Sequence, residues 1–410
     1  MRFKPKGQMM RSMIRFVAAV VLVLAVAWGA LWWYAQQRLQ MGINGWIAQT
    51  TSDGAVQITY DSIVRGTSPL AAEVTLINPR WTFQAAGTNG PLTISAPSFG
   101  LRINAADPLV VHVDLAHQLL LGTPWGATSV TYGSLNIAER LNPQALFNTS
   151  ILPFNGFTTT ASDISVLAGN GIVAVLHIGS FAEHGSVNPQ AGAKDIAYAG
   201  DITLQDISSP TLPVLMALAG KGTNVPFGNN IKQLSLSATL SGPVPADWKQ
   251  QVAAYRAAAL GPDKNKILVQ GLHNWALQGG NATAGLALAV GPSTLSATGN
   301  LAFDTDAQPN GTADINADHL DAFTAELTSA IPQLQQNINI AEGVLSPYLS
   351  TTTAGGQVLT AHVAYGKAGV VVNGGRKADM PPLNWDRLEN PPAPPAQAPG
   401  DGSGAASAGP

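Results

Sequence analysis

An apolar segment near the N-terminus limits the possible folds of this chain more than any other feature. From Met13 to Tyr34 the sequence reads MIRFVAAVVLVLAVAWGALWWY, and the 19 residues that follow Arg15 carry no charge. In a helix about 20 apolar residues cross a bilayer core of about 30 Å, because each residue rises about 1.5 Å. We therefore predict a transmembrane helix over residues 13–34.

The flanks of this segment predict its orientation. Five of the 21 Lys and Arg lie within the first 15 residues, and no Asp or Glu does. Cations stay in the cytoplasm, and aromatic residues prefer the membrane–water interface. We therefore expect residues 1–12 to form a cytoplasmic basic tail and the body to be exported, with the helix held at the membrane interfaces by Arg11, Arg15, Trp32, Trp33 and Tyr34.

A cleavable signal peptide is the alternative for this segment. Ala25-Val26-Ala27 has the small-x-small pattern of a cleavage site. Cleavage there would leave Trp28 and the aromatic cluster at a free N-terminus, whereas an uncleaved anchor accounts for the whole apolar run. In either case the body is exported.

The exported body is rich in strand patterns. From Leu234 to Ser241 (LSLSATLS) apolar and polar residues alternate strictly, and Val56 to Ser62 (VQITYDS) alternates in the same way. A period of two predicts a sheet with one buried face and one wetter face, which favours antiparallel pairing. The fold class we expect is mainly β (α+β): the transmembrane helix is followed by curved antiparallel sheets with a few packed helices.

Helices and turns interrupt the strands. After the membrane, residues 34–51 predict a helix that docks on the body, with Gly42 and Gly45 as a plausible break. Start and stop signals predict a helix over 245–260. We also expect a helical pair over 318–329 and 332–349, broken at Pro332, and a shorter, largely apolar helix over 211–219 that is packed under the sheet. Gln308-Pro309-Asn310-Gly311 predicts a hairpin turn.

Composition changes divide the chain. We expect a periplasmic β-rich half over residues 35–245 and a second, related half with a helical insertion over 246–390. Residues 391–410 contain six Pro and four Gly with little apolar bulk. Such a segment buries too little surface to offset its chain entropy, so we predict a disordered tail.

Charge and cysteine content exclude several functions. The chain has no Cys, so disulfides, thiol nucleophiles and thiolate metal sites are excluded. After the first 15 residues it carries 21 − 5 = 16 basic against 24 acidic residues, a net charge of −8. A weakly acidic body lacks the basic surface that the nucleic-acid backbone requires, so we expect no nucleic-acid partner.

No stretch carries a catalytic motif. Gly-x-Ser-x-Gly and His-Glu-x-x-His are absent, and Gly220-Lys221-Gly222 lacks the spacing of a phosphate loop. His112, Asp114 and His117 approach a metal-ligand spacing, although an exposed polar strand face explains them as well. The calcium-like run that starts at Asp306 has Ala317 at position 12, where a bidentate Glu belongs, which favours a hairpin. We therefore assign no catalytic, cofactor-binding or metal residue and expect no cofactor.

Short motifs along most of the chain resemble an uncharacterised, mostly alphaproteobacterial family, domain of unknown function 2125. The resemblance rests on three clusters. The first follows the aromatic anchor and Trp46 and contains Arg65 to Leu70 and Val74 to Arg80. The second has a His-Asn-Trp element and contains Leu272 to Trp275 and Gly299 to Asp304, and the third ends in a Pro-Pro segment and contains Val371 to Gly375 and Met380 to Leu383. The chain departs from the family at Thr67-Ser68, where an aromatic residue is usual. The resemblance implies an inner-membrane protein that faces the periplasm, and it implies no activity.

We therefore expect a single-pass protein of the bacterial inner membrane with its body in the periplasm. The low charge, the one-sided strands and the missing motifs favour a noncatalytic protein that binds a lipid or other hydrophobic ligand, or that meets another envelope protein during envelope assembly. The alternative is a periplasmic hydrolase or glycan-modifying enzyme that uses dispersed carboxylates.

Overall fold

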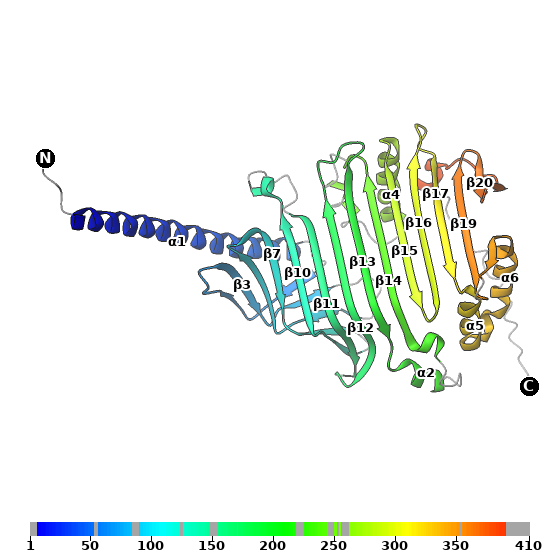
Figure 1. The fold of residues 1–410 in the computed structure, drawn as a ribbon, viewed down its shortest axis with the longest axis horizontal. Coiled ribbons are helices and arrows are strands. Elements are labelled where there is room, and N and C mark those ends of the chain that lie inside the picture. Colours follow the sequence, from blue (N-terminus) through cyan, green and yellow to red (C-terminus); the bar gives the residue numbers. More distant parts are fainter. Residues whose placement is uncertain are drawn as a thin grey trace, which may run out of the picture.

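The computed structural model describes residues 6–52, 56–83, 90–123, 126–146, 154–169, 171–218, 225–244, 250–251, 254–255, 262–352 and 355–390. Across these residues every strand belongs to one antiparallel sheet of 21 strands, which confirms the mainly β fold. A long N-terminal helix projects from one end of the sheet, and shorter helices accompany its other half (Figure 1).

Helix α1 (Lys6–Ser52) joins the predicted membrane segment and the predicted docking helix into one rod. Gly42 and Gly45 lie inside it without a break, so the expected interruption there is wrong. Its segment Val20–Ala48 is long and apolar enough to cross a membrane, and 6% of its most apolar window is buried. The side chains of Arg11 and Arg15 lie outside the described part of the chain.

The first ten strands form two branches. One branch pairs in the order β1, β4, β5, β8, β9, and the other in the order β2, β3, β6, β7, β10. Both branches join the long strand β11, where β10 pairs with its first part and β9 with its last part. The bounds are β1 Val56–Thr59, β2 Ser62–Arg65, β3 Ala71–Ile77, β4 Arg80–Phe83, β5 Leu92–Ser95, β6 Ser98–Asn104, β7 Asp107–Leu115, β8 Gln118–Thr123, β9 Gly126–Thr131 and β10 Ser134–Leu141.

The C-terminal end of α1 packs at the branched end of the sheet. Ile43 is buried against Val74 and Leu76 of β3, and Leu39 and Ile47 lie beside them. The ring of Trp46 stacks on Phe99 with centroids 6.3 Å apart. The apolar spacing that predicts a docking helix over 34–51 is therefore explained by this small core.

From β11 onward each long strand pairs with the next one along the chain, and β17 then pairs with β19. These strands are β11 Phe154–Ala168, β12 Val173–Val187, β13 Ile196–Ser208, β14 Asn230–Ser241, β15 Asn281–Val290, β16 Ser293–Phe303, β17 Pro309–Asp318, β18 Leu349–Thr351, β19 Gln357–Gly366, β20 Gly369–Val372 and β21 Gly375–Ala378. Since β14 pairs directly with β15, the sheet runs without interruption past residue 245. The division into two related halves stays a prediction, and the predicted tail lies outside the described residues.

The described helices after α1 are short. They are α2 Leu212–Leu218, α4 Pro262–Leu277, α5 Leu320–Ala330, α6 Gln335–Leu345 and α7 Trp385–Glu389, with 3-10 turns at Pro143–Leu146, Pro226–Asn229, Pro332–Leu334 and Ser346–Tyr348. The pair broken at Pro332 is confirmed. The prediction that the helix over 211–219 is packed under the sheet is wrong, because Val214, Leu215 and Leu218 are exposed. Most of the helix expected over 245–260 lies outside the described residues.

The hairpin predicted near Pro309 exists, but its turn comes earlier. Strand β16 ends at Phe303, which pairs with Pro309 at the start of β17. The turn is therefore made by residues 304–308, with Ala307 at a positive φ of 51°. The carboxylate of Asp304 accepts hydrogen bonds from the backbone N–H groups of Asp306 and Gln308, both at 2.9 Å, which explains why the chain reverses at this point.

Candidate functional site

One face of the sheet is apolar from β3 to β19. Because strand pairing places paired residues on the same face, the registers define continuous rows of side chains. One row crosses twelve strands through Val74, Leu101, Val113, Ile137, Thr159, Glu183, Ile202, Leu236, Leu286, Ala297, Ile315 and Ala361. A neighbouring row crosses nine strands through Leu135, Ala161, Phe181, Leu204, Leu234, Leu288, Leu295, Ala317 and Leu359.

These rows, together with the alternate residues that continue them along the same strands, form the surface that we call the apolar face. Neighbouring strands lie about 4.8 Å apart, so twelve strands extend over about 50 Å. The local alternation in residues 234–241 predicts one apolar side of a single strand. Only the pairing registers show that the apolar sides of twelve strands are aligned.

Helices cover the apolar face at its two ends. At the first end α1 packs on β3. At the far end Ala276 of α4 and Trp385 of α7 are buried with Phe303, and Phe227 stacks on Phe323 of α5. In the middle, Leu236 is 44% and Leu240 is 41% exposed. In the part of the chain that the structure describes, the apolar face is therefore uncovered at these positions of β14.

Aromatic rings lie over glycines on this face. A Cβ added at Gly185 would come within 2.2 Å of the Phe157 ring, and one added at Gly280 would come within 2.3 Å of the Trp275 ring. Glycine is needed at these two positions because each ring occupies the space of a side chain. The rings add apolar surface where the glycines have none.

Two carboxylates, those of Glu139 and Glu183, lie on the apolar face. Burial raises the pKa of the Glu139 carboxyl. Glu183 lies two strands away from Glu139 and is level with Ile137, which is two residues from Glu139 along β10. The Cα atoms of the two glutamates are therefore about 12 Å apart. Glycosidase carboxyl groups lie about 5 to 10 Å apart. This arrangement gives no observation that favours the hydrolase alternative.

The opposite face is polar and holds a groove of about 630 Å³ over β10 to β14. One ladder row along its floor contains Ala138, Thr158, His184, Asp201 and Ser237. His184 and Asp201 form an exposed pair with 3.2 Å between Nδ1 and the carboxylate. Thr158 and Ser237 flank this pair in the row, and in the described part of the chain neither hydroxyl forms a hydrogen bond with His184, as a nucleophile–base relay would require.

The residues with a metal-like spacing have separate partners. Asp114 forms an ion pair with Arg102 at 3.1 Å, and His117 contacts the ring of Tyr132. His112 lies opposite Ala138 on the polar face. Within the described ranges no group of three or more His, Asp or Glu side chains is placed to hold a metal ion.

Side chains of α1 bind the backbone of β3 and of the turn before it. The indole of Trp28 donates to the carbonyl of Pro69 at 2.9 Å, and that of Trp32 donates to the carbonyl of Ala71 at 3.0 Å. The Gln36 amide donates to the carbonyl of Glu73 and accepts from the Glu73 N–H at 2.9 Å. Residues 28, 32 and 36 recur every four positions, so they lie along one side of the helix.

From the sequence, Trp32, Trp33 and Tyr34 are all expected to lie at a membrane interface. Trp33 and Tyr34 are 58% and 50% exposed, and the Tyr34 hydroxyl accepts a hydrogen bond from Arg38 at 2.8 Å. Trp28 and Gln36 were not identified from the sequence. Their spacing of four from Trp32 is the only sequence signal, and it does not indicate which backbone groups they bind.

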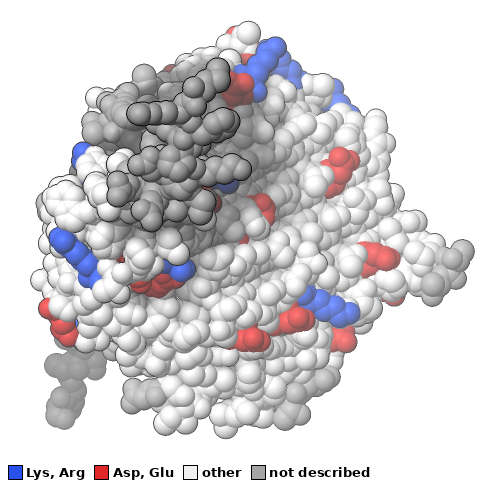
Figure 2. Space-filling model, turned by 60° about the vertical axis from the view of Figure 1, so that its left-hand side comes forward, with Lys and Arg blue, Asp and Glu red and all other residues white. Residues whose placement is uncertain are grey.

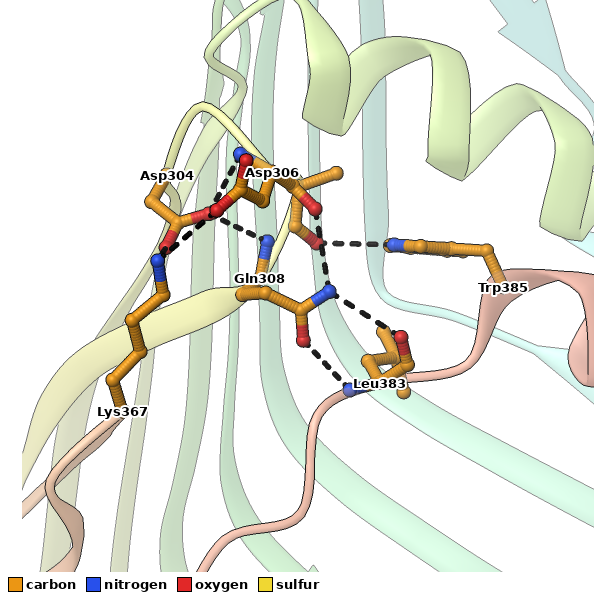
Figure 3. Close-up of polar contacts among 7 residues, drawn as sticks. Asp304, Asp306, Gln308, Lys367, Leu383 and Trp385 are labelled. Carbon is orange, nitrogen blue, oxygen red and sulfur yellow. Dashed lines mark hydrogen bonds and ion pairs between the residues drawn. The ribbon is translucent and has the colours of Figure 1, made fainter.

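The C-terminal segment is fastened to the far end of the apolar face (Figure 3). Gln308 accepts a hydrogen bond from the Leu383 N–H at 2.7 Å and donates to the Leu383 carbonyl at 3.3 Å. The indole of Trp385 donates to the Ala307 carbonyl at 3.1 Å. Lys367 forms an ion pair with Asp304 at 2.9 Å and lowers the pKa of that carboxyl through its hydrogen bond. These contacts hold α7 over Phe303.

Charged side chains are sparse on the surface. Figure 2 brings the α1 side of the molecule forward and shows Lys, Arg, Asp and Glu as isolated spots on a largely uncharged surface. Only 11% of the residues are charged. Among the described residues drawn in this view, Lys and Arg form no basic patch of the kind that binds phosphate backbones.

A family model described as "Uncharacterized protein conserved in bacteria (DUF2125)" matches residues 32–365. The matched range begins in α1 and ends in β19. No curated protein and no solved structure matches the chain.

Proposed function

The chain belongs to this family of uncharacterised bacterial proteins, and we propose that it is a noncatalytic, membrane-anchored envelope protein that holds the acyl chains of a phospholipid on its apolar face. In this proposal the body lies in the periplasm and α1 crosses the inner membrane. The observation that supports it best is the pair of apolar rows: the longer one begins at Val74, beside the anchor helix, and is exposed at Leu236.

Physical arguments favour an acyl chain as the occupant. Isolated exposed apolar residues are ordinary, but aligned apolar rows that reach solvent mark an interaction surface. Burial of apolar area contributes about 25 cal/mol per Å², so a long, flexible hydrocarbon gains from a long face. A bilayer supplies such chains at the site where α1 is anchored. A protein partner would more often leave charged groups around the rim, and charges are sparse here.

Photo-crosslinking at two adjacent positions tests the proposal. Leu236 lies on the apolar face, and Ser237, the next residue of β14, lies on the polar face; both are exposed. A photoreactive p-benzoylphenylalanine is placed at either position of the full chain, which is then expressed in a bacterial host and irradiated in its membranes. Mass spectrometry of the purified protein then measures attached phospholipid.

We expect phospholipid adducts at position 236 at least fivefold above those at position 237. Equal labelling at the two positions, or no lipid at either, would contradict acyl-chain binding. Adducts with one protein at position 236 would instead support the docking of an envelope partner. Because both residues are exposed, we expect both variants to fold.

A further inference from the structure

We infer that the turn formed by residues 66–70, between β2 and β3, is immersed in the periplasmic leaflet, so that lipid passes from the bilayer onto the apolar face without crossing water. We call this segment, Gly66-Thr67-Ser68-Pro69-Leu70, the edge turn. This inference rests on the proposed function, which requires lipid to reach the face.

Charges on α1 mark where the bilayer core can lie. No charged residue lies between Arg15 and Arg38, a stretch of 22 residues. At about 1.5 Å per residue this stretch measures about 33 Å, close to the bilayer core of about 30 Å. If the core begins near Arg15, its far boundary lies near residue 35. Trp28 then lies about 10 Å inside that boundary.

The body is attached to α1 within this same stretch. Trp28 and Trp32 bind the carbonyls of Pro69 and Ala71, so those groups share the depth of the two indoles. The edge turn therefore cannot stand clear of the bilayer while α1 spans it. A depth of about 5 to 10 Å is also where interfacial protein segments bury their apolar side chains.

The charge pattern of the edge turn agrees with this depth. Residues 66–72 carry no charge, and the flanking charges are Arg65 and Glu73. Arg65 donates a hydrogen bond to Gln40, and the Glu73 backbone is bound by Gln36, so both charges lie level with the part of α1 just beyond residue 35. The uncharged stretches of α1 and of the edge turn thus coincide along the membrane normal, and the charge on the adjacent β6–β7 turn is that of Asp107.

Several backbone groups at the edge turn have hydrogen-bond partners within the protein, as immersion in a membrane requires. In hydrocarbon an unpaired N–H or C=O costs several kcal/mol, so such groups must be satisfied internally. Besides the Pro69 and Ala71 carbonyls, the Leu70 N–H donates to Ser68 Oγ at 3.2 Å, and the Leu70 carbonyl accepts from the Ala105 N–H at 2.9 Å. The Leu70 side chain is 66% exposed and is available to the acyl chains.

The placement joins the bilayer to the apolar face. Ala72, the second residue after the edge turn, is buried on β3 and pairs with Ile103 on β6. Val74 on the same side of β3 begins the twelve-strand row. An acyl chain beside Leu70 is therefore next to the covered start of the apolar face, where α1 packs on Val74, and it must pass α1 to reach the exposed part at Leu236.

The experiment uses the absence of native cysteine. Leu70→Cys is labelled with the environment-sensitive fluorophore NBD in the full chain, which is reconstituted in phosphatidylethanolamine and phosphatidylglycerol vesicles. Some vesicles also contain phosphatidylcholine with a spin label on carbon 5 of one acyl chain. The matched control is Ile340→Cys on α6, an exposed apolar residue at the other end of the sheet (Figure 1). A second variant, Thr67→Cys, replaces an exposed residue of the edge turn if position 70 is poorly labelled.

We expect the spin label to quench fluorescence at position 70 at least twofold and to leave position 340 nearly unchanged. Equal quenching at positions 70 and 340 would overturn the immersion. This readout does not depend on lipid binding by the sheet. Quenching at position 70 without phospholipid adducts at position 236 would retain the immersed turn and refute the proposed function.

The entry route has its own test. Leu70→Asp is expected to lower the phospholipid adducts at position 236 at least threefold in membranes, because it places a charge in the leaflet. Val344→Asp on α6, which is 67% exposed, is the control and is expected to have no effect. With lipid presented in detergent micelles, Leu70→Asp and the parent should give equal adducts. Unchanged adducts of Leu70→Asp in membranes would contradict entry at the edge turn.

Discussion

Glu139 is a carboxylate on an apolar face, and burial raises its pKa. A raised folded pKa means that the folded state binds the proton more tightly than the unfolded state. The resulting stability is fully present below the unfolded pKa and is lost as the pH rises through the folded pKa. The Glu139 carboxyl therefore contributes less to the free energy of unfolding at pH 7 than at pH 4.

We predict that Glu139→Gln raises the melting temperature at pH 7 and leaves it unchanged at pH 4, because the amide resembles the protonated acid. Thermal unfolding of the full chain in detergent, followed by circular dichroism at both pH values, measures the difference. A lower melting temperature of Glu139→Gln at pH 7 would show that the ionised carboxylate has a stabilising partner.

Gln36 is the most deeply buried of the three α1 side chains that bind the backbone at β3, with 3% exposed. Gln36→Ala leaves the Glu73 N–H without the partner that the amide supplies, while the Glu73 carbonyl keeps the hydrogen bond from the Gly66 N–H at 2.8 Å. An unsatisfied buried polar group costs about 1 to 3 kcal/mol. We therefore expect a loss of about 1 to 3 kcal/mol in the free energy of unfolding, measured by urea titration with tryptophan fluorescence.

Gln40→Ala is the matched control for this prediction. Gln40 lies one helical turn further along and makes an exposed hydrogen bond to Arg65 at 2.6 Å. Exposed substitutions of this kind change stability by about 0.5 kcal/mol or less. Similar losses in the two variants would contradict a specific Gln36–Glu73 clamp.

Residue patterns identify local structure better than they identify partners. The alternation over Leu234–Ser241 correctly predicts strand β14, because it depends only on neighbours in the chain. The hydrogen bonds of Trp28 and Gln36 reach backbone groups 41 and 37 residues away, and a carbonyl leaves no signature in a sequence. The anchor was predicted from residues 13–34, but its clamp to β3 could not be.

At the scale of elements, α7 is a short helix whose stability depends on one side chain. Trp385 is buried against Ala276 and Ala307, stacks on His273 with ring centroids 4.6 Å apart, and donates to the Ala307 carbonyl. Removal of a buried Trp side chain typically costs about 3 to 5 kcal/mol. We predict a loss of this size for Trp385→Ala.

Hydrogen–deuterium exchange separates a local effect from a global one. In Trp385→Ala we expect faster exchange in residues 379–390 and in α4, which packs on α7, and unchanged exchange in β11 to β13. Leu388→Ala on the same helix is the control, because Leu388 is 44% exposed. Uniformly faster exchange over the whole sheet would contradict a local latch at the far end of the apolar face.

The elements that were mispredicted have physical explanations. Helix α4 was not identified because Gly271 and the low-propensity pair His273-Asn274 weaken its helical signal, which packing against Phe303 outweighs. The turn before β17 was placed at Pro309 because Pro, Asn and Gly favour turns. The Asp304 carboxylate instead captures two backbone N–H groups earlier in the chain.

At the scale of the whole molecule, α1 lies along the long axis, and the strands of the sheet follow one another along the same axis (Figure 1). α1 projects from one end, and successive strands from β10 to β19 lie progressively further from it. With α1 across a bilayer, the twelve-strand row therefore leads away from the membrane over about 50 Å. Such a face suits the extraction or transfer of acyl chains better than a closed cavity for one ligand.

The arrangement also predicts the orientation of the whole molecule in the membrane. The five cations before Phe16 favour a cytoplasmic N-terminus, and the structure places the sheet at the opposite end of α1. We test it with two single cysteines, Ser12→Cys in the basic tail and Ile340→Cys on α6. A membrane-impermeant maleimide of about 5 kDa is added to cells whose outer membrane has been permeabilised.

We expect position 340 to be labelled in these cells and position 12 only after lysis of the inner membrane, with a band shift of the full-length chain in both cases. Labelling of position 12 before lysis would contradict the N-in orientation. A body band that cannot be shifted through position 12 even after lysis would show cleavage near Ala27 and support the signal-peptide alternative. Cleavage would remove the stretch that crosses the bilayer while it leaves Trp28, Trp32 and Gln36 on the body, so the clamp on β3 would persist without an anchor. The edge turn would then have no fixed depth in a membrane, which makes retention of residue 12 a requirement of lipid entry at Leu70.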